Sequence, residues 1–162
     1  MLLLCGSSAP PASTTTRPVA STRPFSGLQL TIEWGRQRAQ AGTPIDLIIR
    51  LSNQSDREQV YLQYNPDCAF SFVVTDDHGQ PVARTAIGNL VDQRRVRVVS
   101  AERRRLLPGQ SNTYRIRLNR QFDMSEKGLY RVQADYVSAR PVGEDPPISR
   151  SNELVIEIVD DN

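Results

Sequence analysis

Apolar and polar residues alternate along most of this chain, and this period of two restricts its fold more than any other feature. Residues 28–34 read LQLTIEW, in which every second side chain is apolar. Such alternation is typical of strands with one buried and one exposed face. Similar segments, separated by Asn, Asp, Gly and Pro, are residues 45–52, 59–64, 68–76, 106–118, 128–136 and 153–160. About eight or nine short strands of this kind predict an antiparallel β-sandwich, because a βαβ fold would need helices between them.

The segment from residue 86 to residue 105 is the least regular part of the chain. Residues 94–100 read RRVRVVS and alternate like a charged strand, which predicts that Arg95 and Arg97 point outward. No segment predicts a helix of three turns, and residues 124–127 are the best candidate for a single helical turn. The sequence therefore predicts an all-β domain over residues 28–162.

The segment before that domain differs from it in composition. Of the 22 residues from 6 to 27, 13 are Ser, Thr or Pro. A segment of this kind buries too little apolar surface to offset its chain entropy. Residues 1–27 are therefore predicted to form a disordered tail or stalk, and the remaining residues are enough for one domain with its own core.

The start of the tail resembles the end of a bacterial lipoprotein signal, in which a Cys after a short apolar run carries the lipid. Residues 2–4 are leucines, Cys5 follows, and Gly-Ser-Ser comes next. A complete signal has a basic region and roughly 7–15 apolar residues, so the resemblance implies a start codon further upstream. An unrelated disordered tail and an artefact are the alternatives. On the first interpretation, Cys5 is the lipid attachment site.

Few residues of this chain are suited to catalysis or to metal binding. His78 is the single His, and the chain has two Cys. Zinc sites draw on several Cys and His ligands, and a Ser or Thr nucleophile needs a base, so neither site is expected. Asp67, Asp76 and Asp77 carry the oxygen ligands that Ca²⁺ prefers, but their spacing matches no Ca²⁺-binding loop. We therefore expect no enzyme activity, no cofactor and no metal.

Arginines gather in one part of the chain, although the formal net charge is only +2. They are Arg94, Arg95, Arg97, Arg103, Arg104 and Arg105. Such a cluster can form a docking patch for an acidic partner, a phosphate-bearing polymer or lipid headgroups. It is also typical of an edge strand whose charges prevent aggregation. No aromatic residue lies between these arginines, so a nucleic-acid partner is not expected.

Residues 126–132 read EKGLYRV and resemble the run that leads into strand F of immunoglobulin-like domains. Gly128 and Tyr130 match that run, whereas Val132 stands where antibody domains have a Cys. The resemblance implies a structural corner in which the Tyr130 hydroxyl bonds to nearby backbone. Together with LPGQS at 107–111, the run is similar to bacterial and secreted Ig-like domains, including the bacterial intracellular proteinase inhibitor family. We therefore expect an Ig-like β-sandwich.

These features lead to two hypotheses about function. The first is a non-enzymatic Ig-like binding or assembly module of the bacterial cell envelope, which is a lipoprotein if Cys5 carries a lipid. Its partner would be a protein or an anionic envelope component, and a lipid anchor would be its contact with a membrane. The alternative is a proteinase inhibitor, implied by the family resemblance, with exposed loops at 65–68, 84–93 or 140–149. Without an anchor, the cytoplasm is the expected location.

Overall fold

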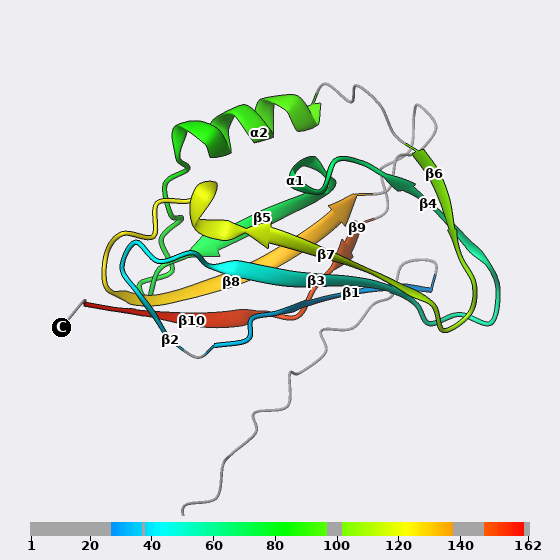
Figure 1. Cartoon of the computed structure of the whole chain (residues 1–162), viewed down its shortest axis with the longest axis horizontal. Helices are drawn as coiled ribbons and strands as arrows, with labels where there is room; N and C mark the ends of the chain where they lie inside the picture. Colours follow the sequence, from blue (N-terminus) through cyan, green and yellow to red (C-terminus); the bar gives the residue numbers. More distant parts are fainter. Residues whose placement is uncertain (1–26, 37, 97–101, 138–147, 161–162) are drawn as a thin grey trace, which may run out of the picture.

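The computed structural model describes residues 27–36, 38–96, 102–137 and 148–160. The predicted tail with Cys5, and also Arg97, lie outside these residues. Within them the fold is mostly β (Figure 1). The elements are β1 (Leu28–Glu33), β2 (Arg38–Gln40), β3 (Asp46–Asn53), β4 (Gln59–Gln63), α1 (Pro66–Ala69), β5 (Phe70–Thr75), α2 (Ala86–Val96), β6 (Glu102–Leu106), β7 (Ser111–Arg117), η1 (Leu118–Arg120), β8 (Gly128–Val137), β9 (Ile148–Arg150) and β10 (Leu154–Val159).

The strands form two larger sheets and one ribbon (Figure 1). The first sheet has the order β1-β3-β7, and both of its pairings are antiparallel. The second has the order β2-β10-β8-β5, with β9 also paired to β8. In this sheet the short β2 runs parallel to β10, and the other pairings are antiparallel. A separate antiparallel ribbon joins β4 to β6. A mostly β fold with antiparallel sheets is therefore confirmed.

The buried faces of the two larger sheets enclose one hydrophobic core. From the first sheet, β3 contributes Leu47, Ile49 and Leu51, each with 0% of its surface exposed. From the second sheet, Phe70 and Val132 are buried to the same degree. Burying a side chain of this size stabilises the fold by roughly 1.5–3 kcal/mol. The alternation in the sequence is thus explained by two sheets that each bury one face.

Helix α2 shows that the prediction of a charged strand at 94–100 is wrong over residues 94–96, the part that the structure describes. The 11-residue helix also contradicts the expectation that the chain has no helix of three turns. Thr85 caps the helix, since its hydroxyl accepts a hydrogen bond from the Gly88 N–H at 3.0 Å. Gly88 packs against the backbone of Gln121, whose carbonyl oxygen would lie 2.0 Å from an added Cβ. Only glycine therefore allows this close approach.

The sequence does not reveal α2 because its inward face is too small to give a helical pattern. Over residues 86–94 of the helix, Gly88 and Val91 are the buried positions, whereas Ile87 and Leu90 are 41% and 53% exposed. Apolar residues therefore occur on both faces, and the 3.6-residue period that reveals an amphipathic helix is absent. Among the described residues, no helix is long and apolar enough to cross a membrane.

The predicted helical turn at 124–127 is also wrong, and the turn lies earlier, at the 3₁₀ helix η1. The chain after η1 is held extended, because the Asp123 N–H donates a hydrogen bond to the Ala83 carbonyl at 2.9 Å. The Asp123 carboxylate in turn accepts from the Ser125 hydroxyl at 2.7 Å. Hydrogen bonds to a distant segment and to a local side chain thus replace the helical ones.

A short helix also takes the place of the first residues of the strand predicted at 68–76. Pro66 stands in the first turn of α1, where its missing N–H is not needed. Asn65 caps that turn by accepting a hydrogen bond from the Asp67 N–H at 3.1 Å. The strand β5 then begins at Phe70. The one-turn helix α1 separates β4 from β5, so that β4 can pair with β6 and β5 with β8.

Candidate functional site

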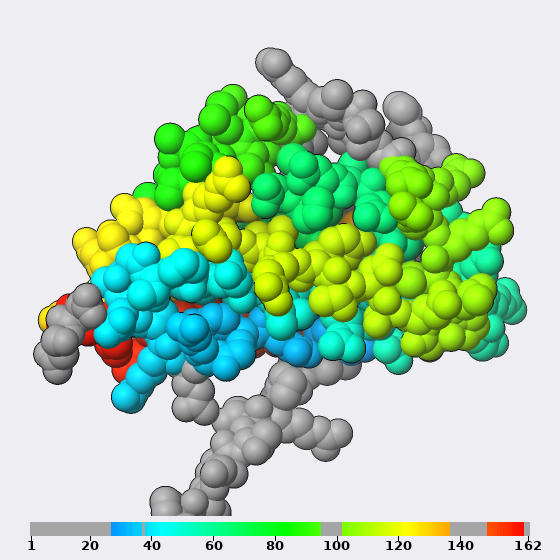
Figure 2. All heavy atoms as spheres, viewed as in Figure 1, coloured from blue at the N-terminus to red at the C-terminus, as the bar shows by residue number. Residues whose placement is uncertain are grey.

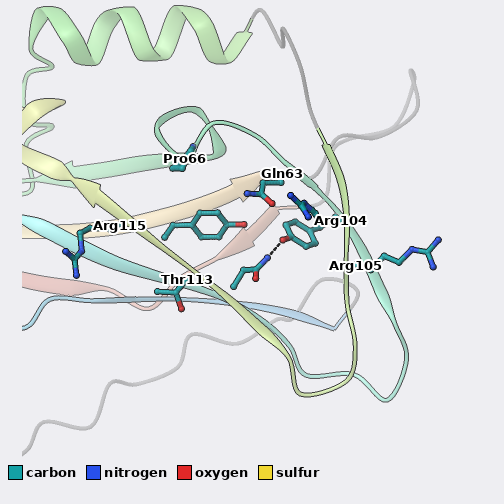
Figure 3. A pocket seen from close by; sticks show the side chains of 9 residues that line it. Gln63, Pro66, Arg104, Arg105, Thr113 and Arg115 are labelled. Carbon is teal, nitrogen blue, oxygen red and sulfur yellow. Dashed lines mark hydrogen bonds between the residues drawn. The ribbon is translucent and has the colours of Figure 1, made fainter.

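An open hollow of about 550 Å³ lies between the β4–β6 ribbon and strand β7 (Figure 3). Its lining comes from β4, α1, β6 and β7 and consists of Tyr61, Gln63, Pro66, Arg104, Arg105, Asn112, Thr113, Tyr114 and Arg115. We call this feature the arginine hollow. Figure 2 shows that the atoms of β6 and β7 are exposed on this face of the molecule, next to those of β3. The hollow is therefore open to a partner from solvent.

The arginine hollow exists because β6 and β7, although consecutive, pair with different strands. The turn between them contains Gly109, whose φ of 75° favours glycine, and is closed by the Gln110 N–H donating to Leu107 O at 3.0 Å. Before that turn β6 pairs with β4, and after it β7 pairs with β3. The two strands thus diverge from the turn and leave the hollow between them.

The side chain of Asn53 holds the strands together at the point where β6 and β7 begin to diverge. It is fully buried, and its amide donates to the carbonyls of Arg57 at 2.7 Å and Leu106 at 2.9 Å. Its oxygen accepts from the backbone and the hydroxyl of Ser55, at 2.9 and 2.7 Å. Asn53 therefore ties the ends of β3, β4 and β6 together.

Tyrosines form the floor of the arginine hollow. Tyr61 and Tyr114 are 1% and 9% exposed, and the Asn112 amide donates a hydrogen bond to the Tyr61 hydroxyl. The Tyr136 hydroxyl donates to the Leu62 carbonyl at 2.9 Å, which anchors β4 on β8. Burial, followed by the hydrogen bond with Tyr61, raises the pKa of Tyr114 above its ordinary value. This shift keeps the Tyr114 hydroxyl protonated, and hydroxyl groups are the polar component of the floor.

The charge of the arginine hollow is entirely positive, since none of its nine lining residues is acidic. Arg104 pairs with Glu102 at 2.8 Å and Arg105 with Glu58 at 3.4 Å, and both pairs lie at the surface. Arg115 is exposed and has no ion pair among the residues that the structure describes. Surface pairs of this kind contribute only about 0–1 kcal/mol. An acidic ligand could therefore replace Glu102 as the partner of Arg104 at little cost.

The hollow contains only part of the predicted docking patch. Arg103, Arg104 and Arg105 are consecutive on β6, and Arg104 and Arg105 line the hollow. In Figure 3, Gln63 and Arg104 lie on the ribbon side and Thr113 and Arg115 along β7, while Arg105 points away. Arg94 is exposed near the end of α2, on a different element. Arg97 and the side chain of Arg95 lie outside the described part of the chain.

Of the nine residues that line the arginine hollow, only Arg104 and Arg105 were predicted as site residues, and three of the other seven illustrate why. They are Tyr61, Asn112 and Arg115, which come from β4 and β7. Arg115 was detectable in principle, because the alternation of residues 111–117 places it on the exposed face of a strand. Tyr61 and Asn112 gave no signal, since their meeting depends on which strands pair.

The residues assigned to the structural corner lie on the second sheet, outside the arginine hollow. The Tyr130 hydroxyl donates a hydrogen bond to the Glu126 carbonyl at 2.8 Å, four residues upstream. Gly128 begins β8 with a φ of 150°, which favours glycine. Burial, and then the nearby carboxylates of Glu126 and Asp123, raise the pKa of Tyr130. This is the backbone bond that the sequence interpretation assigned to Tyr130.

The other polar residues considered from the sequence form turns. Asp76 accepts hydrogen bonds from the N–H groups of His78 at 2.9 Å and Gln80 at 2.7 Å, which closes an exposed turn. The Nε2 atom of His78 lies 3.4 Å from the Oδ1 atom of Asp77, and the His78 side chain is 81% exposed. Within the described residues, no group of three or more His, Cys, Asp or Glu could hold a metal ion.

Two of the three loops considered for proteinase inhibition overlap helices. Most of residues 65–68 belongs to α1, and most of residues 84–93 belongs to α2. The third loop, 140–149, lies outside the described residues except for its last two. The helices leave little extended backbone at the first two positions.

Comparisons with known proteins place the chain in no family. No protein-family model matches it, and no curated protein matches it in sequence. Among solved structures it is similar to β-glucosidase from Listeria innocua in complex with isofagomine, with a TM-score of 0.42 and 15% identity. The complex of that protein with glucose gives 0.42 and 14%. In both, the similarity covers 85% of this chain but 17% of the other.

Proposed function

We propose that this protein is a non-enzymatic Ig-like binding module that recognises an acidic partner through the arginine hollow. One observation carries the proposal: Arg104 and Arg115 line a single open hollow that has no acidic lining residue. Guanidinium groups present several donors in a fixed fork, which suits carboxylates and phosphates. The tyrosine floor adds hydroxyl groups.

The order of the strands supports the Ig-like part of this proposal. In Ig domains strands A, B and E share one sheet, and C, F and G share the other. Here β1, β3 and β7 occupy one sheet in that order, and β5, β8 and β10 occupy the other. The bond from Tyr130 to the Glu126 carbonyl stands at the start of β8, where strand F would have its tyrosine corner.

The composition of residues 1–27 supports the placement of this module in the bacterial cell envelope. The segment would act as a stalk, with a lipid on Cys5 as the anchor. Cells that express the gene with its upstream sequence should incorporate labelled fatty acid into the protein, and the Cys5→Ser variant should not. Unlabelled wild-type protein would contradict the anchor while leaving the arginine hollow untouched.

The hollow itself is tested with three polyanions: poly-L-glutamate, inorganic polyphosphate, and vesicles that contain anionic phospholipid. The variant Arg104→Ala/Arg115→Ala should bind at least one of them about tenfold more weakly than wild type, because roughly 1.4 kcal/mol of charge-assisted bonding is lost. The matched control is Arg36→Ala/Arg120→Ala, which removes two exposed arginines that have no ion pair among the described residues.

Two results would overturn the proposal. Wild-type protein that binds none of the three polyanions at low ionic strength would show that the arginines serve only to keep the edge soluble. An equal loss in the hollow variant and in the control would show that overall charge, rather than the arginine hollow, is responsible.

A further inference from the structure

The backbone of β7 has an outer edge that opens into the arginine hollow. Two hydrogen bonds bracket its pairing with β3: Asn53 N–H to Gln110 O at 2.9 Å, and Leu118 N–H to Ile45 O at 2.8 Å. In an antiparallel pair, hydrogen-bonded and non-hydrogen-bonded positions alternate. The register therefore directs the backbone groups of residues 112, 114 and 116 toward β3. Those of residues 111, 113, 115 and 117 point to the outer edge.

These outer groups are open along the part of β7 that borders the hollow. The backbone N–H and C=O groups of Thr113 and Arg115 have no hydrogen-bond partner within the described ranges. The segment 111–115 spans roughly 13 Å at about 3.3 Å per residue. Pro66 of α1 also lines the hollow, so this helix flanks the strand. An unpaired strand edge of this length can accept a further strand.

We propose that an extended acidic segment of a partner protein adds as a strand to β7 along residues 111–115, an inference that rests on the proposed function. The backbone of the segment would pair with Thr113 and Arg115. Its side chains would alternate between two environments, because those of a strand point to opposite faces. Acidic residues would lie beside Arg115 on the exposed face, and small apolar residues over Tyr114 on the inner face.

Charge complementarity and the open backbone together select this occupant. Opposite charges on adjacent strands stabilise their pairing, and Arg115 has no ion pair of its own among the described residues. The N-terminal segment of this chain is a poor occupant, since residues 1–26 contain two arginines and no acid. Polyphosphate and lipid headgroups could bind the guanidinium groups of the arginines, but they have no peptide backbone that could pair with Thr113.

The test uses Thr113→Pro, because proline removes the N–H group that a bound strand needs. That N–H faces away from β3, so the variant keeps every bond of the β3–β7 pairing, and proline is tolerated at such edge positions. The probes are a labelled peptide of four Glu-Val repeats and inorganic polyphosphate. We expect Thr113→Pro to bind the peptide at least about tenfold more weakly and polyphosphate as well as wild type does. Thr113→Ala, which retains the N–H group, should match wild type for both.

Hydrogen exchange on wild-type protein gives a readout that does not depend on any variant. The peptide should slow exchange at the amides of Thr113 and Arg115, and polyphosphate should not. Normal peptide binding by Thr113→Pro, or unchanged exchange at these amides, would overturn strand addition. The arginine dependence would then still support the proposed function. Loss of arginine dependence for both probes would instead overturn the proposed function itself.

Discussion

The two outer strands of the sheet β1-β3-β7 differ in how their unpaired backbone is treated. At the β1 edge, the Asn152 side chain accepts a hydrogen bond from the Ile32 N–H at 2.9 Å and donates to its carbonyl at 3.1 Å. The Ser149 hydroxyl donates to Leu28 O, further along the same edge, at 3.2 Å. At the β7 edge, Thr113 and Arg115 have no such partners within the described residues.

Among the residues that the structure describes, this difference shows that other groups of the chain seal the β1 edge but not the β7 edge. Asn152 and Ser149 are 7% and 6% exposed, so the β1 edge is closed by buried groups. The β7 edge is bordered by exposed Arg115 and Thr113 and by the arginine hollow. Charged residues at an edge discourage pairing with another copy of the same chain. In the proposed function the same charges select an acidic partner, so protection and recognition are compatible at β7.

The largest effect on stability is expected for Asn53→Ala, which removes the hydrogen bonds that tie β3, β4 and β6 together next to the open β7 edge. The substitution removes the donor of a buried hydrogen bond to the Leu106 carbonyl and of a part-buried one to the Arg57 carbonyl. The free energy of unfolding should fall by about 3 kcal/mol. Urea denaturation measures this value, and peptide binding should weaken as well, because β6 is no longer tied to β3. A loss below about 1 kcal/mol would contradict the role of Asn53.

A smaller loss is expected when the sealed edge is opened by Asn152→Ala. The Ile32 N–H and C=O groups then lose their partners, which should lower the free energy of unfolding by about 2 kcal/mol. Binding of the Glu-Val peptide should not change, since β1 lies two strands away from the hollow. Thr113→Ala at the other edge is the control and should change stability by less than about 0.5 kcal/mol. Equal losses at the two edges would remove the contrast between them.

The Tyr130→Phe variant measures the contribution of a single hydrogen bond that lies away from both edges. It gives a reference value for the two larger losses of stability. It removes the bond to Glu126 O and should cost about 1 kcal/mol of stability in a thermal melt. Tyr64→Phe is the matched control, because Tyr64 is half-buried and its hydroxyl has no hydrogen-bond partner among the described residues. If the two variants melted alike, the Tyr130 hydroxyl would not stabilise the corner.

Much of the β structure follows from local pattern. In β8 the alternation predicts Val132, Ala134 and Tyr136 inside, and each is at most 2% exposed. Helix α2 did not follow, because a buried glycine and a distant backbone carbonyl position it. The residues near Gly88 in the sequence do not indicate its contact with the backbone of Gln121. Local periodicity thus identifies elements that bury a regular face, but not those held by one close contact.

The arginine hollow depends on strand pairing, which local pattern does not specify. A connection of four residues between β6 and β7 favours a hairpin. Instead β6 pairs with β4, and Asn53, about fifty positions earlier in the chain, supplies bonds that hold it there. The sequence therefore revealed the cluster of Arg103, Arg104 and Arg105 but not the hollow that two of them line.

The smallest change in stability is expected for Arg115→Val, which separates protection of the edge from recognition. The side chain is exposed, so the free energy of unfolding should change by less than about 0.5 kcal/mol. Without this charge, the open backbone of β7 can pair with a second copy of the chain. Sedimentation velocity should therefore show more self-association than for wild type. Arg50→Val is the control, since Arg50 is exposed on the central strand β3, whose backbone is paired on both sides. Equal self-association of the two variants would mean that added apolar surface, and not an open edge, drives it.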